Sequence, residues 1–246
     1  MIISGGGRCN VTTGITDKNL LLKKYTRGSN FLKAALSKFG PDDVFRWFED
    51  HDTPLKIEDD LRVFPRSDDG KDVIAVFEKL FAQHNVSVHF KSRVTSITKN
   101  DGQFIIETKK GKTAVDFVVI GTGGNAYRRT GSTGDGYHFA ESLGHTITPL
   151  GPSLNSFLTQ EQWPKDLSGL ALTHAQILFG TPKSSCPFLF THFGISGPLT
   201  ITISSHIAFE QVTQEEPFSI TLILDTRISP EQWKKLLNDK SNAKKQ

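Results

Sequence analysis

The sequence predicts an α/β fold, and two observations carry this expectation. Residues 117–120, Phe-Val-Val-Ile, form an unbroken run of apolar β-formers, which is typical of a strand buried on both faces of an α/β sheet. Before this run, an extended stretch at 57–65, an amphipathic helix at 72–83 and a strand at 86–90 give a β-α-β rhythm. We therefore expect residues 117–120 to be a central strand of the sheet.

A glycine-rich loop follows the predicted central strand directly. Gly121, Gly123 and Gly124 allow a tight turn there, or let the backbone approach a ligand without a Cβ in the way. Residues 121–126 satisfy the loose G-x-G-x-x-G/A dinucleotide pattern, which is weak evidence by itself. A predicted meander of strands, at 94–98, 103–108 and 113–120, precedes the loop, whereas the first strand of a Rossmann unit does not arrive that way. The glycines therefore either face a ligand or only make turns.

Helix signals surround these strands. Residues 29–38 and 41–49 are predicted as two short helices, with Pro41 at the first position of the second. A third helix is predicted at 137–143, with N-cap oxygens from Ser132, Thr133 or Asp135 and with Gly144 as its C-terminal glycine. Because a helix start preceded by glycines is a ready anion site, residues 131–136 are a second candidate ligand loop.

The character of the sequence changes after His145. Strands are predicted at 146–150, 170–179 and 218–225, and a second glycine-bearing motif lies at 188–198. His192 lies between aromatic residues in this motif, so a packed histidine is expected, with a catalytic histidine as the alternative. A helix is predicted to start with Ser229 as N-cap, Pro230 at the first position and Gln232 closing a capping box. This change predicts two domains, 1–145 and 146–246.

Composition narrows the function classes. Of 246 residues, 37% are hydrophobic and 22% are charged, and no run approaches the roughly 20 apolar residues of a membrane span. The beginning of the sequence lacks a signal-peptide pattern, so a cytoplasmic location is expected. A net charge of +3 is mild, which predicts no nucleic-acid partner and no membrane partner. Cys9 and Cys186 form neither a disulfide framework nor a zinc pattern, so no metal site is expected. The oligomeric state stays open.

Three consecutive glycines near the beginning of the sequence form another candidate ligand loop. The backbone N–H groups of residues 5–7 could face an anion, with Arg8 adding charge and Asn10 adding side-chain hydrogen bonds. The alternative is a flexible tail without a ligand. Cys9 is equally compatible with a small buried filler and with a redox group.

Four motifs in order along the chain resemble the BaiN-like (YhiN-like) family of bacterial NAD(P)/FAD-dependent oxidoreductases. They are Ile-Ser-Gly-Gly-Gly-Arg-Cys-Asn-Val-Thr at 3–12, Arg-Val-Phe-Pro at 62–65, Gly-Ser-Thr-Gly-Asp-Gly-Tyr at 131–137 and Phe-Thr-His-Phe-Gly-Ile-Ser-Gly-Pro at 190–198. The resemblance covers nearly the whole chain. It implies a flavoprotein that NAD(P)H reduces and that acts on a small organic substrate.

The resemblance also implies a more specific fold and site. Residues 1–145 would be an incomplete Rossmann-like FAD-binding domain, and residues 146–246 a β-barrel-like insert domain beginning a helical bundle. By similarity to two-dinucleotide-domain flavoproteins, Val94 would lie near the adenine. The full set of residues implied to bind FAD is Ser4, Gly5, Gly6, Gly7, Arg8, Cys9, Asn10, Val94, Thr122, Gly123, Gly124, Gly131, Ser132, Thr133, Gly134 and Asp135. The resemblance names no catalytic residue.

The family pattern extends beyond this sequence on both sides. Members open with a strand, a G-x-G-x-x-G turn and a helix ahead of the position of Ile2, so the resemblance implies a chain truncated at both ends. Because that first turn grips the pyrophosphate, we expect this chain alone to bind FAD weakly. Two alternatives stay open. One is a non-catalytic remnant without tight cofactor binding, and the other is an NAD-binding domain that uses residues 121–126, which the preceding meander disfavours.

Overall fold

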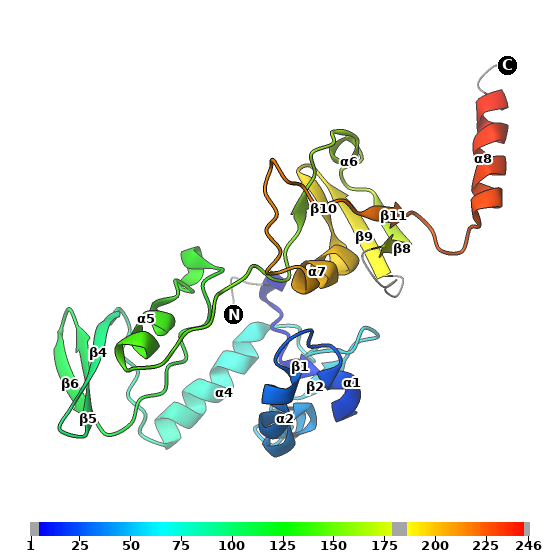
Figure 1. Cartoon of the computed structure of the whole chain (residues 1–246). Coiled ribbons are helices and arrows are strands. Elements are labelled where there is room, and N and C mark those ends of the chain that lie inside the picture. The colour runs from blue at the N-terminus through cyan, green and yellow to red at the C-terminus, as the bar shows by residue number, and fades with distance from the viewer. Residues whose placement is uncertain (1–4, 179–185, 244–246) are drawn as a thin grey trace. The chain divides into compact units, whose positions relative to one another are not determined.

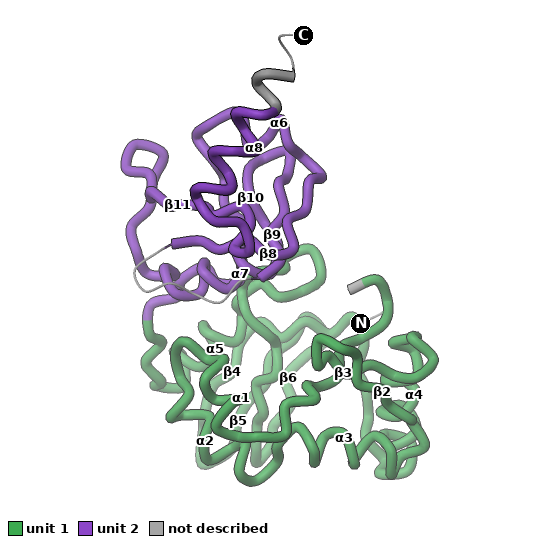
Figure 2. The backbone as a smooth tube through the Cα atoms, turned by 90° about the vertical axis from the view of Figure 1, so that its right-hand side faces the viewer, with its two compact units in different colours: residues 1–148 green, residues 149–246 purple. Residues whose placement is uncertain are grey.

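A computed structural model describes residues 5–178 and 186–243 of the chain. The chain divides into two compact units, Met1–Thr148 and Pro149–Gln246, which Figure 2 colours separately. Three sheets form in the described part of the chain, and every strand pair in them is antiparallel. The fold is therefore mixed α/β with antiparallel sheets. No helix in the described ranges is long and apolar enough to cross a membrane.

The first unit begins with a small sheet covered by helices (Figure 1). Its strand order is β1-β3-β2, and residues Gly5–Gly7 form a 3-10 turn ahead of it. The buried side chains of Phe48, Leu55, Val63, Val73 and Val76 join this sheet to α3 and α4 in one hydrophobic core. The elements are β1 (Thr12–Thr13), α1 (Lys18–Leu22), α2 (Ser29–Lys38), α3 (Pro41–Glu49), β2 (Leu55–Ile57), β3 (Arg62–Pro65) and α4 (Gly70–Gln83).

The helix predictions in this region are confirmed. Helices α2 and α3 have the predicted bounds, and Pro41 occupies the first position of α3. Helix α4 begins at Gly70, two residues earlier than predicted, because the Asp69 carboxylate caps it by accepting the Lys71 N–H at 2.9 Å. Local capping chemistry therefore sets these boundaries.

The meander is also confirmed, although its third strand ends at Val115 and not at the predicted residue 120, and a helix packs on it. Strands β4 (Val94–Asn100), β5 (Gln103–Thr108) and β6 (Gly111–Val115) pair in sequence order. After the 3-10 turn Arg128–Thr130, helix α5 (Asp135–Ser142) lies against β4, and the Ser142 hydroxyl donates to the Ile97 carbonyl at 3.1 Å. Gly144 follows α5 with a φ of +89°, the left-handed conformation that favours a C-terminal glycine.

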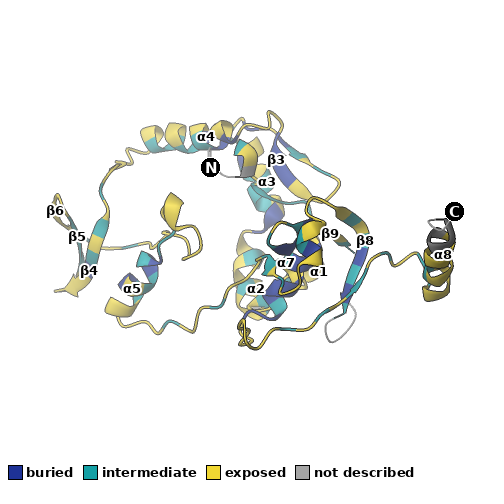
Figure 3. Cartoon of the chain, turned by 90° about the horizontal axis from the view of Figure 1, so that it is seen from above, coloured by how far each residue is buried: buried dark blue, intermediate teal, exposed yellow. Residues whose placement is uncertain are grey.

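The predicted central strand is wrong in this structure. Residues 117–120 form no strand, and Phe117 and Val119 are 89% and 95% exposed. Figure 3 colours the ribbon by how far each residue is buried. The predicted strand at 86–90 is absent too, with Phe90 79% exposed. A strand is stable only when a neighbour takes its N–H and C=O groups, and no described strand pairs with either segment. Apolar β-propensity alone does not supply that neighbour.

The second unit is a five-stranded antiparallel sheet in the order β11-β8-β9-β10-β7. Helix α7 packs on it, and Phe188, Phe190, Ile195, Leu199 and Ile203 are buried in their shared core. The described strands leave β11 and β7 at the edges, so the predicted β-barrel and helical bundle stay predictions. The elements are β7 (Phe157–Leu158), α6 (Trp163–Asp166), β8 (Ala171–Leu178), β9 (Cys186–Thr191), β10 (Gly194–Ser196), α7 (Gly197–His206), β11 (Thr221–Ile223) and α8 (Pro230–Ala243).

Three expectations for this unit need correction. Residues 146–150 form no strand, and residues 197–206 form a helix that the sequence did not predict. His192 is exposed beside the ring of Phe193 and is not packed in the core. By contrast, β8 occupies most of the strand predicted at 170–179, of which residue 179 lies outside the described residues, whereas β11 is confined to Thr221–Ile223 within the strand predicted at 218–225. The Ser229–Gln232 capping box forms, with the Ser229 N–H donating to the Gln232 side chain at 2.8 Å.

Two phenylalanine substitutions in the first unit test whether Phe48 is buried and Phe117 is exposed. Phe48→Ala is expected to lower the free energy of unfolding by about 3–5 kcal/mol, because it removes a side chain only 5% exposed from the core. Phe117→Ala is expected to change it by no more than about 0.5 kcal/mol. Urea unfolding followed by circular dichroism measures both. Comparable losses for the two variants would show that residues 117–120 are buried in solution.

Candidate functional site

Hydrogen bonds, ion pairs and backbone contacts gather the predicted site residues into two groups. The first group is the loop 5–10 and the strand and helix beside it. The second group is formed by residues 121–125 and 131–136, near the start of β4. Ser4 lies outside the described residues.

The first loop lies directly on the N-terminus of α4. Gly6 and Gly7 have φ values of +68° and +81°, a region that favours glycine, and Cys9 adopts a left-handed φ of +61°. A Cβ added to Gly70 would lie 2.7 Å from the Gly7 carbonyl oxygen and 3.2 Å from the Cys9 Cβ. This contact requires a glycine at the first residue of α4, so the loop and the helix start are built as one unit.

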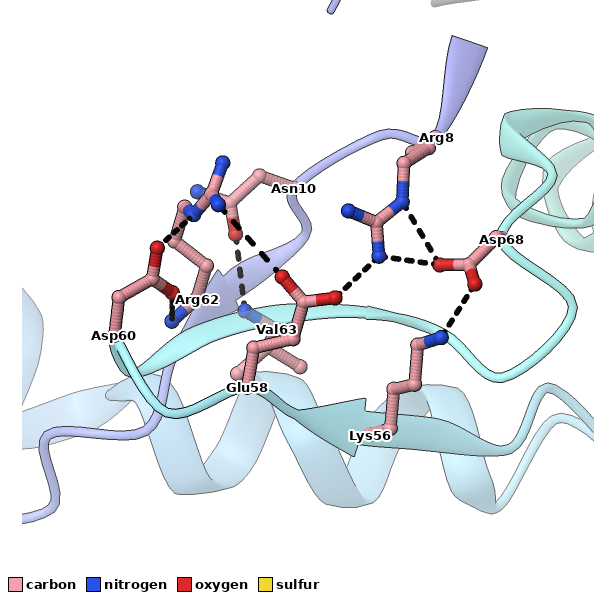
Figure 4. A network of polar contacts seen from close by, with 8 residues as sticks. All are labelled: Arg8, Asn10, Lys56, Glu58, Asp60, Arg62, Val63 and Asp68. Atoms are coloured by element: carbon pink, nitrogen blue, oxygen red, sulfur yellow. Dashed lines mark hydrogen bonds and ion pairs between the residues drawn. The ribbon is translucent and has the colours of Figure 1, made fainter. Parts of the chain in front are cut away.

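Arg8 is neutralised by two carboxylates (Figure 4). Its guanidinium donates to Glu58 and, from Nε at 2.9 Å, to Oδ1 of Asp68, and it lies 4.0 Å over the ring of Phe64. Hydrogen bonds from Lys56 and then Arg8 hold the pKa of Asp68 below its ordinary value. Glu58 and then Asp68 raise the pKa of Arg8. The positive charge of Arg8 is therefore compensated within the protein.

Asn10 ties the other end of the loop to β3. Its Oδ1 atom accepts the Val63 backbone N–H at 3.1 Å, and the Val11 N–H donates to the Val63 carbonyl at 2.8 Å. Val63 itself is completely buried. The side-chain oxygen of Asn10 thus satisfies a buried backbone donor, which is a structural bond.

The second group is two glycine loops packed against each other. The Gly134 N–H donates to the Gly124 carbonyl at 3.2 Å. A Cβ on Gly136 would lie 2.4 Å from Oγ1 of Thr122, and one on Gly123 would lie 3.2 Å from Oγ of Ser132. Gly123 and Gly134 also have φ values of +73° and +83°. The two candidate ligand loops that the sequence predicts separately therefore form one surface.

This surface leaves exposed backbone at two glycines. No heavy atom outside the neighbouring residues lies within 4 Å of a Cβ built on Gly121 or on Gly131, and both residues are exposed. A ligand can therefore approach the main chain at either position without meeting a side chain. The backbone of Gly131 has a φ of +103°, whereas Gly121 lies outside the left-handed region.

Asp135 does not cap α5, which corrects one prediction. The N-cap of α5 is Gly134, and no side chain caps the helix, so the predicted N-cap roles of Ser132, Thr133 and Asp135 are wrong. The Asp135 carboxylate instead accepts the Thr133 hydroxyl at 2.9 Å and the Arg93 guanidinium at 3.0 and 3.1 Å. The Thr133 hydrogen bond, and then Arg93, hold the pKa of Asp135 below its ordinary value.

Sequence reasoning missed Arg93. It directly precedes Val94 at the start of β4, and its partner lies 42 residues further along the chain. The pair thus places Val94 next to the segment that carries the glycine loops. A single exposed arginine has no pattern from which this pairing could be read. Among the residues described here, no three His, Cys, Asp or Glu side chains are placed to hold a metal ion.

The lowered pKa of Asp135 gives a testable consequence. Thr133→Val is expected to raise this pKa most and Arg93→Gln less, following the order of the two causes. Because a lowered carboxylate pKa contributes stability above about pH 4 that is lost as the pH falls, both variants should show a smaller acid-dependent loss of stability. NMR titration of the Asp135 carboxyl measures the change, with Asp68 as an internal control. An unchanged Asp135 pKa in both variants would contradict the described contacts.

The chain is similar to known proteins over most of its length. The family model of the HI0933-like protein Rossmann domain matches residues 1–222. The 3-dehydro-bile acid delta(4,6)-reductase of Clostridium scindens is 27% identical over 215 residues, covering 85% of this chain and 51% of that protein. Ribosomal RNA dihydrouridine synthase of Escherichia coli is 27% identical over 210 residues, with 84% and 51% covered.

A second ribosomal RNA dihydrouridine synthase, from Haemophilus influenzae, is 24% identical over 214 residues, covering 84% of this chain and 52% of that protein. The chain thus spans about half the length of the curated relatives it matches. The family model matches far more than half of the chain, and its range includes the glycine loops described above. The chain belongs to the HI0933-like family, within its Rossmann domain.

Proposed function

We propose that this chain is part of an FAD-dependent oxidoreductase that is reduced by NAD(P)H. The observation that carries the proposal is the exposed glycine backbone of the two packed loops, at Gly121 and Gly131, in a chain of a Rossmann-domain family. Dinucleotide folds use glycines at such turns so that the main chain can approach the cofactor. The proposal concerns the activity of the whole protein. This chain spans about half the length of the relatives it matches.

The residues of the second group fit the cofactor that the proposal requires. Exposed main chain at Gly121 and Gly131, with hydroxyls of Ser132 and Thr133 close by, offers hydrogen-bond donors without a side chain in the way. Bound FAD would supply the hydride chemistry, whereas the protein supplies position and electrostatics. The residues we propose to hold FAD here are Val94, Thr122, Gly123, Gly124, Gly131, Ser132, Thr133, Gly134 and Asp135.

The first group is proposed to contribute main-chain contacts. Gly5, Gly6 and Gly7 form a turn without side chains, and a Cβ on Gly6 would meet no other atom within 4 Å. We include Ser4, Cys9 and Asn10 in the proposed site by resemblance. The contacts of Arg8 and Asn10 are with the protein itself, so their part in binding is indirect.

The names of two relatives narrow the substrate class. A delta(4,6)-reductase and a dihydrouridine synthase both describe hydrogenation of carbon–carbon double bonds. We therefore propose that this protein reduces such a bond in a small organic substrate. The hydride added to one carbon would come from NAD(P)H by way of FAD, which leaves NAD(P)⁺, and the proton added to the other carbon would come from water. The mild net charge of +3 favours a small molecule over RNA, because RNA binding needs a strong positive patch. We also propose that the protein is located in the cytoplasm.

Substitution of Gly121 tests the proposed binding surface. Gly121→Val is expected to leave the fold intact, since a Cβ built there has no other atom within 4 Å and the backbone is not left-handed. It should weaken FAD binding by about tenfold or more by blocking approach to the main chain. Ala114→Val, an exposed position on β6, is the matched control and should bind like the original chain. Flavin fluorescence on titration gives the dissociation constant, and thermal melts check folding.

Two results would count against the proposal. If the original chain shows no saturable binding of added FAD, the non-catalytic alternative is supported. If Gly121→Val binds FAD as well as Ala114→Val does, the cofactor does not approach this loop. Binding of NAD in place of FAD, weakened by Gly121→Val, would favour an NAD-binding domain.

A further inference from the structure

The structure assigns Arg8 the role of a positioning residue, which holds the glycine loop 5–7 in place through Glu58 and Asp68 and does not itself bind the cofactor. This inference rests on the proposed FAD site and changes the role that the sequence suggests for this arginine. Three observations on the described residues support this inference. Arg8 contacts the β2–β3 region, the charges around it are balanced, and close contacts hold the loop on both sides of it.

Arg8 contacts a part of the chain that lies 50 to 60 residues further along the sequence. Glu58 follows β2, Asp68 precedes the N-cap of α4, and Phe64 lies on β3 beneath the guanidinium at 4.0 Å. Arginine is suited to this task because its planar fork pairs with carboxylates while its face stacks on an aromatic ring. The ring of Phe64 is only 4% exposed, so the guanidinium rests on a fixed support.

The local charges are balanced without a ligand. Figure 4 shows the carboxylates and cations of this network linked to one another. A phosphate that approached Arg8 would meet the negative charges of Glu58 and Asp68 and would have to displace them. Three cations face three carboxylates, namely Arg8, Lys56 and Arg62 against Glu58, Asp60 and Asp68. The site around Arg8 is therefore complete as an internal ion-pair network.

The loop on both sides of Arg8 is fixed by close contacts. On one side, the Gly7 carbonyl lies against Gly70 at the start of α4. On the other side, Asn10 binds the Val63 N–H on β3. Arg8 ties the segment between these points to the hairpin of β2 and β3. Its loss should therefore free the glycine turn, and any contribution of the turn to FAD affinity should decrease with it.

The direction in which Glu58→Gln changes the affinity for FAD distinguishes positioning by Arg8 from direct binding by Arg8. If Arg8 acts through its partners, Arg8→Gln and Glu58→Gln should each weaken FAD binding by about tenfold, and the double variant should be no weaker than either one. If Arg8 binds a cofactor phosphate, Glu58→Gln removes a competing charge and should tighten binding. Arg8→Lys should restore only part of the affinity, because an ammonium cannot reproduce the planar fork. The matched control is Arg46→Gln, which breaks an exposed pair with Asp43 in α3.

A measurement without FAD keeps this inference separate from the proposed function. Hydrogen exchange of the backbone amides of residues 5–12 should be faster in Arg8→Gln and Glu58→Gln than in the original chain or in Arg46→Gln. Equal exchange in all four proteins, or tighter FAD binding by Glu58→Gln, would overturn the positioning role. If no protein binds FAD but the exchange differs as expected, the positioning of the loop stands and the proposed cofactor site fails.

Discussion

The close contact between two glycine loops is the constraint on which the candidate site depends. The Gly134 N–H donates to the Gly124 carbonyl, and a Cβ on Gly136 would lie 2.4 Å from the Thr122 hydroxyl oxygen, so the contact requires a glycine at position 136. This packing joins a loop after the meander to the start of α5. Once the loops are joined, the main chain at Gly121 and Gly131 remains exposed on the same surface. The site is thus made of backbone, and its side chains mainly support it.

Both groups of site residues are supported in the same way. In each, carboxylates that lie far along the sequence from an arginine hold its guanidinium. Arg8 joins the first loop to Glu58 and Asp68, and Arg93 joins the start of β4 to Asp135. Such partly or fully exposed ion pairs contribute little to overall stability, because water screens them. Their geometric effect is larger, since each arginine fixes the direction of a loop relative to a strand. An arginine near a glycine loop is therefore weak evidence for anion binding until its partners are known.

Local signals in the sequence predicted much of the fold, and long-range pairing limited the rest. Helices α2 and α3 and the meander were predicted because caps, proline and turn residues act within a few positions. Residues 117–120 were predicted to be a buried strand, yet a strand needs a partner that propensity does not provide. Helix α7 was missed because β-branched residues favour strands, whereas its burial against β9 decides the outcome. The glycine loops were recognised in the sequence, but the carboxylates beside Arg8 and Arg93 lie 42 to 60 residues away.

We propose that the two packed glycine loops form the surface that faces FAD. NMR of the chain labelled with ¹⁵N-glycine tests it most directly, because the proposed contacts are main-chain groups and the chain has 21 glycines. On titration with FAD, the amide signals of Gly121, Gly123, Gly124, Gly131 and Gly134 are predicted to shift together and to follow one saturable dissociation constant. Gly102 and Gly111, in the turns of the meander, should not move. Saturable FAD binding that leaves the loop signals unchanged would contradict the account.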